Sequence, residues 1–399
     1  MLLATVALAL VPSPSGASAS VPRPLHLPNA RLESVSCPRS NACMAVGWYR
    51  GRSQPLPLAE RWNGTLWRRL TLPELPSSNG KPTGYFYGVS CTSVGRCWAV
   101  GNYHTPSGSD AALIERWRGG KWRLVPGPAG LSHDDAYLYG VSCAGADLCF
   151  AVGDDFQFAA GAGIQRGLAL EWIGSHWSQT PTPTIAKPYS MTVQFEMVSC
   201  VQGSCMAVGY AATRGQTAAK ALAERWNGHA WVLTKVHSMN LGTGHWNILD
   251  GVSCRGPHWC VATGFLAGPN RYPPLIEQWN GSRWHIVPAA RSRTPHTLLG
   301  MVSCPSRSSC TTVGFAGGLV TASDGLTQTF AEHWSGARWL VQSTPGTGKG
   351  YDQLDAVSCA TVTTCMAVGW STTRTVDVLD GATLALIWRN GVWSITPSP

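Results

Sequence analysis

One sequence unit recurs along almost the whole chain and leaves few folds open to it. In the second copy, Tyr85 to Pro128, an apolar run ends in Val-Ser-Cys, a turn leads to Cys and Ala-Val-Gly, and two Trp follow. The first cysteines of the copies stand at 37, 91, 143, 200, 254, 304 and 359, a spacing of 50 to 57 residues. Periods near this length are typical of propeller blades. The seven copies therefore predict a β-propeller with one blade per copy.

Each copy has the pattern of four short strands, which we name a to d. In the second copy we place them at Tyr87 to Cys91, Cys97 to Gly101, Ala112 to Trp117 and Lys121 to Val125. A Trp pair with four residues between its members marks strands c and d in every copy, and we assign these rings to the core. In several copies Asn-Gly lies between the two Trp, which is a strong hairpin signal. The sequence thus predicts an all-β fold, a seven-bladed propeller of four-stranded antiparallel blades.

The cysteines all belong to the repeat. The 14 residues fall into pairs that close the a–b hairpins, none being left over: Cys37 with Cys43, Cys91 with Cys97, Cys143 with Cys149, Cys200 with Cys205, Cys254 with Cys260, Cys304 with Cys310, and Cys359 with Cys365. In an exported protein such pairs indicate disulfides, whereas zinc sites favour Cys-x2-Cys or nearby His. Because the loops that they close are small, each disulfide is expected to stabilise the folded protein by only roughly 2 kcal/mol.

The N-terminus has the pattern of a secretory signal. An apolar run, Leu2 to Val11, is followed by small residues that end in Ala17-Ser18-Ala19. We interpret residues 1–19 as a signal peptide, 20–31 as a linker and 32–399 as the propeller, with repeats starting near 32, 85, 137, 194, 248, 298 and 353. No later stretch reaches the ~18 apolar residues that span a bilayer. We expect a secreted, extracellular protein, free or associated with the cell wall.

The charge of the chain does not identify a class of partner. The net charge is +9, but basic residues form no long run, and such a diffuse excess usually serves solubility. It would also suit anionic polymers such as cell-wall polysaccharide or nucleic acid. We expect no nucleic-acid partner, no cofactor, no metal and a monomeric chain.

The repeat resembles known families. Its Gly after strand b and its aromatic residues in strands c and d resemble kelch repeats and the propeller of galactose oxidase. It departs from them in having one Gly where they have a pair, and in its cysteines. It is more similar still to exported Trp-rich repeat proteins of actinobacteria with VSC…C-x-AVG…ERWNG…W units. The resemblance covers residues 32–399 and implies a propeller, while it says little about activity.

Topology indicates where a ligand would bind. The a–b and c–d turns are short and share one face of the disc, which we name the turn face. The long b–c and d–a connections share the other, the loop-rich face, and loops on a rigid scaffold commonly carry function. Aromatic and acidic residues gather there, and rings with carboxylates suit sugars, although the rings also fit packing between blades. The candidate ligand-binding residues are Tyr87, Tyr139, Trp246, Asp250, Asp352, Asp355, Tyr103 and His104.

A Glu two places before the first Trp recurs in five copies and is interpreted as part of the scaffold. It stands at Glu60, Glu115, Glu224, Glu277 and Glu332, with Glu171 shifted by one place and Leu386 in the last copy. A catalytic acid is needed once or twice per protein, so five copies argue against catalysis. We expect these carboxyls to be partly buried and to pair with backbone N–H groups or an Arg of the adjacent blade.

No catalytic template is matched. The sequence lacks the sialidase box Ser-x-Asp-x-Gly-x-x-Trp, a Gly-x-Ser-x-Gly elbow and His-Glu-x-x-His. His133, Asp134, Asp135, His104 and His245 could serve as ligands or bases, but we interpret them as surface loop residues.

The hypothesis is an exported, non-catalytic binding or scaffold propeller that recognises a glycan or a protein through its loop-rich face. The alternative is an exported lyase or hydrolase with carboxylates or His at the channel mouth. Two carboxylates about 5 to 9.5 Å apart would favour hydrolysis. Bulky side chains that fill the channel would favour binding.

Overall fold

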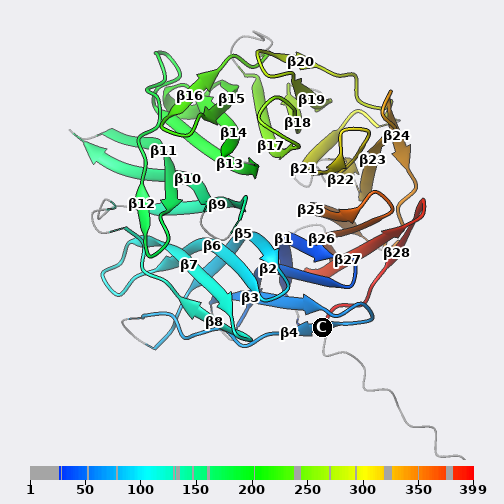
Figure 1. The fold of residues 1–399 in the computed structure, drawn as a ribbon, viewed down its shortest axis with the longest axis horizontal. Coiled ribbons are helices and arrows are strands. Elements are labelled where there is room, and N and C mark those ends of the chain that lie inside the picture. The colour runs from blue at the N-terminus through cyan, green and yellow to red at the C-terminus, as the bar shows by residue number, and fades with distance from the viewer. Residues whose placement is uncertain are drawn as a thin grey trace, which may run out of the picture.

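The chain forms a ring of blades around a central axis (Figure 1). The computed structural model describes residues 27, 29–51, 54–77, 80–128, 131, 135–145, 148–159, 162–201, 203–237, 244–268, 271–292, 294–318, 326–348, 350–373 and 381–399. These residues form strands β1 to β28 and a single 3-10 turn, Arg214–Gln216. The prediction of an all-β, seven-bladed propeller is confirmed.

Each blade contributes one strand of each kind, with strand a innermost. The a strands are β1 (Ala30–Arg39), β5 (Gly84–Ser93), β9 (Ala136–Cys143), β13 (Thr192–Val201), β17 (Trp246–Cys254), β21 (Thr297–Ser306) and β25 (Tyr351–Thr361). The b strands are β2 (Ala42–Arg50), β6 (Arg96–His104), β10 (Cys149–Ala159), β14 (Ser204–Ala212), β18 (Cys260–Ala267), β22 (Ser309–Gly317) and β26 (Thr364–Thr372). The c strands are β3 (Pro55–Trp62), β7 (Asp110–Arg118), β11 (Ala162–Trp172), β15 (Ala219–Trp226), β19 (Pro274–Trp279), β23 (Thr327–Trp334) and β27 (Ala382–Arg389). The d strands are β4 (Trp67–Arg69), β8 (Lys121–Leu124), β12 (Trp177–Gln179), β16 (Trp231–Thr234), β20 (Trp284–Ile286), β24 (Trp339–Gln342) and β28 (Val392–Ile395).

Within every blade the strands pair a-b-c-d and antiparallel. Blades 1, 2, 6 and 7 are separate four-stranded sheets. Blades 3, 4 and 5 form one 12-stranded sheet because single parallel pairs, Gln165 with Thr192 and Ala219 with Trp246, join strand c of one blade to strand a of the next. These links lie at the loop-rich ends of the strands and leave the blades intact.

The sequence pattern places the end of strand b at a Gly, but in the structure this Gly lies within the strand. Strand b does not end there: β6 continues past Gly101 to His104. Strand a carries a β-bulge opposite this Gly, and a Cβ built on Gly101 would overlap the carbonyl oxygen of Tyr85. The corresponding Gly faces the strand-a backbone in the same way in all the blades, at Gly47, Gly101, Gly153, Gly209, Gly264, Gly314 and Gly369. The glycine is required because only hydrogen fits against the bulged strand.

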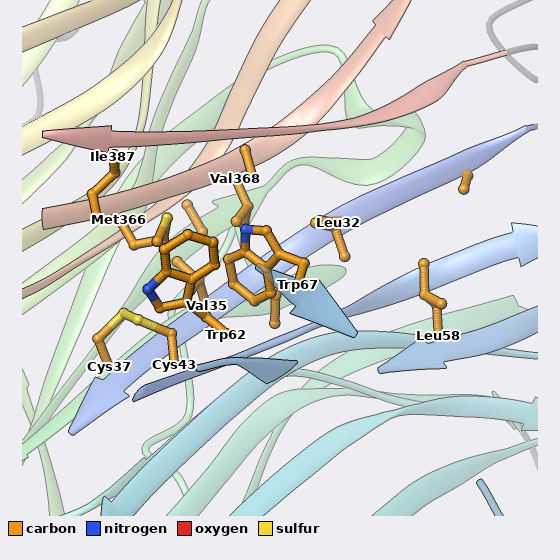
Figure 2. Close-up of a cluster of buried hydrophobic side chains, with 14 residues drawn as sticks. Leu32, Val35, Cys37, Cys43, Leu58, Trp62, Trp67, Met366, Val368 and Ile387 are labelled. Carbon is orange, nitrogen blue, oxygen red and sulfur yellow. A yellow bond between two sulfur atoms is a disulfide. The ribbon is translucent and has the colours of Figure 1, made fainter. Parts of the chain in front are cut away.

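The core consists of the interfaces between neighbouring blades. Between blades 7 and 1, Trp62 and Trp67 of blade 1 pack with Met366, Val368 and Ile387 of blade 7 (Figure 2). Every other blade-to-blade interface has a buried cluster of the same kind. The Trp pairs are thus core residues, as predicted, and their large apolar area drives the blades together.

A closed belt of hydrogen bonds connects the inner strands. The Ser of each Val-Ser-Cys accepts a hydrogen bond from the backbone N–H of the first Cys in the next blade, for example Cys91 N to Ser36 Oγ at 2.9 Å. The other six links join Cys143 to Ser90, Cys200 to Ser142, Cys254 to Ser199, Cys304 to Ser253, Cys359 to Ser303 and Cys37 to Ser358. The belt gives the backbone N–H of the first Cys in each blade an acceptor on the neighbouring blade.

Blades 1 and 7 close the ring by packing face to face. The link from Cys37 N to Ser358 Oγ is 2.9 Å long, and Trp67 Nε1 donates to Thr396 Oγ1 at 3.2 Å. Both blades are complete, with strands β1 to β4 and β25 to β28. The interpretation of residues 1–19 as a signal peptide concerns residues outside the described ones, as does most of the linker.

All the predicted disulfides are present, and the described residues contain no free cysteine. The bridges join Cys37 to Cys43, Cys91 to Cys97, Cys143 to Cys149, Cys200 to Cys205, Cys254 to Cys260, Cys304 to Cys310, and Cys359 to Cys365. Each closes the end of an a–b hairpin, where Cys91 and Cys97, for example, face each other across the strand pair. They fit an extracellular protein. Over the described part of the chain, no helix has the length and apolar character needed to cross a bilayer.

A substitution at the bulge tests the role of its glycine. We expect Gly101→Ala to destabilise the protein by about 1–3 kcal/mol or more, because the methyl group overlaps a backbone carbonyl that cannot move without displacing the inner strand. Gly95→Ala in the same blade is the control, since no atom lies within 4 Å of its Cβ position. Denaturant unfolding measures both; equal stability of the two variants would contradict the steric explanation.

A second variant tests the hydrogen-bond belt. Ser36→Ala leaves the N–H of Cys91 without its acceptor, and we expect a loss of about 1–3 kcal/mol in the free energy of unfolding. Ser40→Ala changes an exposed serine of the same blade and should have little effect. Denaturant unfolding measures both variants. If Ser36→Ala unfolds at the same denaturant concentration as the wild type, the belt contributes nothing to stability.

Candidate functional site

The bulge in each strand a directs one residue to the propeller axis, and in six of the seven blades this residue carries a side chain. The bulged residue stands four places before the first Cys in every blade. We name these residues the channel ring: Glu33, Tyr87, Tyr139, Glu196, Asp250, Gly300 and Asp355. Bulges commonly re-aim side chains next to functional sites.

The channel ring lines a single cavity of about 310 Å³. Because all the inner strands contribute to it, the cavity lies on the axis of the ring. Its wall at blades 5 and 6 is apolar, with Phe265, Leu298 and Phe315. Gly300 leaves the ring open at blade 6, and a Cβ there would lie 2.7 Å from the carbonyl oxygen of Asp355. The cavity therefore combines a carboxylate ring with an apolar recess.

The four carboxyl groups of the ring are partly buried, and they act on one another in two pairs, Glu196 with Asp250 and Glu33 with Asp355. Burial, with the charge of nearby Asp154, raises the pKa of Glu196 to about 7. Burial and Glu196 raise the pKa of Asp250 well above its usual range, and burial and Glu33 do the same for Asp355. Burial also raises the pKa of Glu33. In each case the charged form is disfavoured, which a cation in the cavity would reverse.

Among the described residues, one cationic side chain adjoins the ring. The Arg31 guanidinium lies over the rings of Trp370, 4.1 Å from its centroid, and Trp48, at 5.3 Å. Its charge acts on Glu33 and Asp355 and partly opposes their raised pKa values. Trp48 Nε1 also donates to Glu33 Oε1 at 2.9 Å. Arg31 is thus a structural cation held between indoles.

Tyrosines form the wall at blades 2 and 3. Tyr87 stacks on Tyr85 at 6.0 Å and packs against Tyr139 at 5.3 Å, and Tyr139 stacks on Tyr137 at 6.3 Å. Burial and the neighbouring carboxylates raise the pKa values of Tyr87 and Tyr139, so both stay neutral. Their electron-rich ring faces adjoin the acidic positions, as in sites for organic cations.

Glutamines orient two of the carboxylates. Gln194 Nε2 donates to Glu196 Oε1 at 2.7 Å, and Gln353 Nε2 donates to Asp355 Oδ1 at 2.5 Å. The second oxygen of Asp355, Oδ2, is buried and has no hydrogen-bond partner among the described residues. A buried acceptor of this kind is costly unless a donor reaches it.

The structure brings four of the predicted site residues together in the channel ring: Tyr87, Tyr139, Asp250 and Asp355. Glu33 and Glu196 belong to the same ring, although the prediction did not include them. Their place in the repeat, four residues before the Cys, is the signal that finds them.

The other four predicted residues lie outside the cavity. Trp246 packs on Tyr210 at 5.7 Å. Asp352 is buried and accepts hydrogen bonds from the N–H and hydroxyl of Thr347, both at 2.7 Å. Tyr103 lines a groove between blades 2 and 3, and exposed His104 lies 3.1 Å from Asp110. His133 and Asp134 are outside the described residues.

The recurring Glu of strand c is more deeply buried than expected, with 0% of its surface exposed in all five blades. Glu277 accepts from the N–H of His237 at 3.0 Å and Glu332 from that of Ala290 at 3.0 Å, both in the preceding blade, as expected. The carboxyls of Glu60, Glu115 and Glu224 have no hydrogen-bond partner among the described residues. Burial raises the pKa of these three to about 8. These groups are part of the scaffold and do not reach the channel.

Within the described residues, no group of three or more His, Cys, Asp or Glu side chains is arranged to hold a metal ion.

Comparison with known proteins supports the fold. No protein-family model matches the chain, and no curated protein matches it. Among solved structures it is similar to YCF48 bound to D1 peptide, with a TM-score of 0.51 and 11% identity over 92% of this chain and 96% of that one. It is also similar to YCF48 from Cyanidioschyzon merolae, with a TM-score of 0.50 and 14% identity over 91% of this chain and 96% of the other. At these identities the likeness shows a shared propeller fold. The kelch and actinobacterial resemblances are not confirmed.

The buried Glu residues make stability depend on pH. Because their pKa rises from 4.5 to about 8 on folding, their contribution is fully present below about pH 4.5 and is lost as the pH rises through about 8. We expect the melting temperature to fall between pH 5 and pH 8.5. The melting temperature of the triple variant Glu60→Gln, Glu115→Gln, Glu224→Gln should fall less over this range, because an amide does not ionise.

Exposed Glu74→Gln is the control and should retain the wild-type pH dependence. Thermal unfolding followed by circular dichroism at several pH values measures the difference. A triple variant with the wild-type slope would contradict the assignment of this pH dependence to the strand-c carboxyls.

Proposed function

We propose that this protein is an exported, non-catalytic binding propeller whose channel ring takes a positively charged organic group. The observation that carries the proposal is the ring itself, in which four carboxyl groups and two tyrosines line one cavity on the axis. Its disulfides fit the extracellular setting.

The charge of the cavity selects the ligand. Four carboxyls adjoin one guanidinium, Arg31, which is already held by two indoles. An ammonium or guanidinium group in the cavity would allow the carboxyls to ionise at neutral pH and would give Asp355 Oδ2 a donor. A neutral sugar would not favour the ionised form of these carboxyls and would gain nothing from their charge.

A basic side chain of a protein partner suits this cavity best. Its charged end would lie among Glu196, Asp250 and Asp355, while its aliphatic part would contact the apolar recess at Gly300. The YCF48 propeller was solved with a D1 peptide, so a propeller of this architecture is able to take a peptide. In this proposal the partner approaches from the loop-rich face.

The alternative function is hydrolysis, and one observation favours it. The pKa of Glu196 near 7 would let this carboxyl act as a general acid at neutral pH, with Asp250 in the next blade as its partner. A retaining or inverting hydrolase also needs an ionised carboxylate. Burial raises the pKa values of all four ring carboxyls and so disfavours the ionised form that this role needs, and binding is the better-supported function.

Titration calorimetry with short peptides tests the proposal. We expect tetralysine to bind, and tetraglutamate and tetraserine not to bind. The double variant Glu196→Gln, Asp250→Asn should weaken tetralysine binding at least about tenfold, since each charged hydrogen bond is worth about 1.5–3 kcal/mol. Affinity for the wild type should rise from pH 6 to pH 8, as the carboxyls ionise with a pKa near 7 for Glu196.

Glu171→Gln, on strand c away from the cavity, is the control and should bind as the wild type does. Equal affinity for the three peptides, or an unchanged affinity of the ring variant, would rule out the channel ring as a cation site. Release of p-nitrophenol from aryl glycosides, abolished by the ring variant, would favour the hydrolase.

A further inference from the structure

We propose that the turn face is a binding surface for a linear polyanion. This surface is separate from the channel ring, and the proposal does not depend on the function suggested above. In blade 1, four residues lie in one row across the sheet: Cys37, Cys43, Trp62 and Trp67. The a–b and c–d turns both follow this row, so they share one end of each blade.

Contacts between the turns confirm that they form one surface. Asn390 N in the c–d turn of blade 7 donates to Thr363 O in its a–b turn at 3.1 Å. In blade 5 a Cβ on Gly281 would lie 2.9 Å from His258 of the neighbouring turn. A Cβ on Gly256 of blade 5 would lie 3.8 Å from the guanidinium of Arg307 in blade 6. The turns of adjacent blades are therefore neighbours.

This surface is strongly basic. Its turns and the residues that bound them carry nine cations, all exposed: Arg39, Arg96, Arg118, Lys121, Arg255, Arg283, Arg307, Arg338 and Arg389. The described residues of these turns include no Asp or Glu, and the sequence has one acid there, Asp147, outside the described residues. No ion pair of the described chain involves these cations.

The positive surface arises because the acids are elsewhere. Five Glu are fully buried in the c strands, and four of the other acids point into the channel. The sequence suggested a diffuse excess for the net charge of +9, but the described part of the turn face carries cations without compensating carboxylates. A field of one sign over a face concentrates oppositely charged partners there.

A flexible polymer with repeated phosphate or carboxylate groups fits this face best. The cations follow an arc of five consecutive blades, 5, 6, 7, 1 and 2, with one to three in each, so a flexible chain can meet them in succession. Arginine, the residue at eight of these nine positions, binds both kinds of anion with two parallel hydrogen bonds. The face consists of tight turns and offers no helix or protruding strand, among the described residues, to enter a groove of duplex DNA. A propeller bound this way would direct its channel mouth away from the polymer.

Binding of the whole protein to immobilised polyphosphate and polygalacturonate tests the proposal. We expect affinity for at least one polymer to fall steeply between 50 mM and 200 mM NaCl. The quadruple variant Arg255→Gln, Arg283→Gln, Arg307→Gln, Arg338→Gln should bind at least about tenfold more weakly and show a smaller salt dependence, by about one unit of log–log slope per lost contact.

The control removes as many exposed cations from the loop-rich side, by Arg50→Gln, Arg166→Gln, Arg214→Gln and Arg271→Gln, and should bind like the wild type. Circular dichroism confirms that both variants are folded. Preference for one polymer identifies the anion as phosphate or carboxylate and supports the proposal. Equal losses in the two variants, or binding only to duplex DNA or to vesicles with anionic lipid, would overturn it.

Discussion

The whole molecule depends on one steric constraint, the absence of a side chain opposite the bulge of each inner strand. Only glycine allows the backbone of strand a to approach strand b so closely, as Gly101 does beneath Tyr85. The bulge then turns one residue out of the regular alternation and toward the axis. Without it, the residue that faces the channel would point into a blade interface. The same glycine is therefore a requirement of the fold and of the site.

The inner strands are held in this position from two sides. On the blade faces, apolar clusters such as Trp62, Trp67 and Met366 exclude water between neighbours (Figure 2). Along the ring, the Ser–Cys belt joins every blade to the next, and the disulfides keep the donor end of each hairpin in place. Because a rigid ring supports it, the channel holds carboxyls close together that would separate on a flexible scaffold.

The distribution of carboxyl groups links the two proposed surfaces. Carboxylates that on most proteins would lie at the surface are here in the c strands, as Glu115 is, or in the channel, as Asp250 is. Burial in these places raises the pKa values of the carboxyls. It also leaves the arginines of the turn face with almost no carboxylate to compensate their charge. Two opposite charge patterns thus arise from one arrangement, an acidic interior channel and a basic turn face.

Much of the candidate site could be predicted from the sequence because the repeat places equivalent residues at the same position in every blade. The sequence predicts Tyr87, Tyr139, Asp250 and Asp355 as candidates, and alignment of the copies on their cysteines adds Glu33 and Glu196. The sequence also predicts Asp352 and Trp246, which stand near these residues along the chain. Strand direction separates them, since Asp352 lies at the loop end of its strand, where Thr347 binds it. Proximity along a strand does not determine which face a residue occupies once a bulge has changed the alternation.

The sequence by itself determined the number of blades, the strand order, the cysteine pairing and the core tryptophans. Those follow from local spacing, turn chemistry and hydrophobic pattern, which each copy carries in full. Only the tertiary structure decided that seven separate positions meet around one cavity and that nine distant cations share one face. The physical reason is that closure of the ring brings together residues more than 300 places apart, as in the bond from Cys37 to Ser358, 321 residues away. No single repeat contains the information on what its neighbours present to the axis.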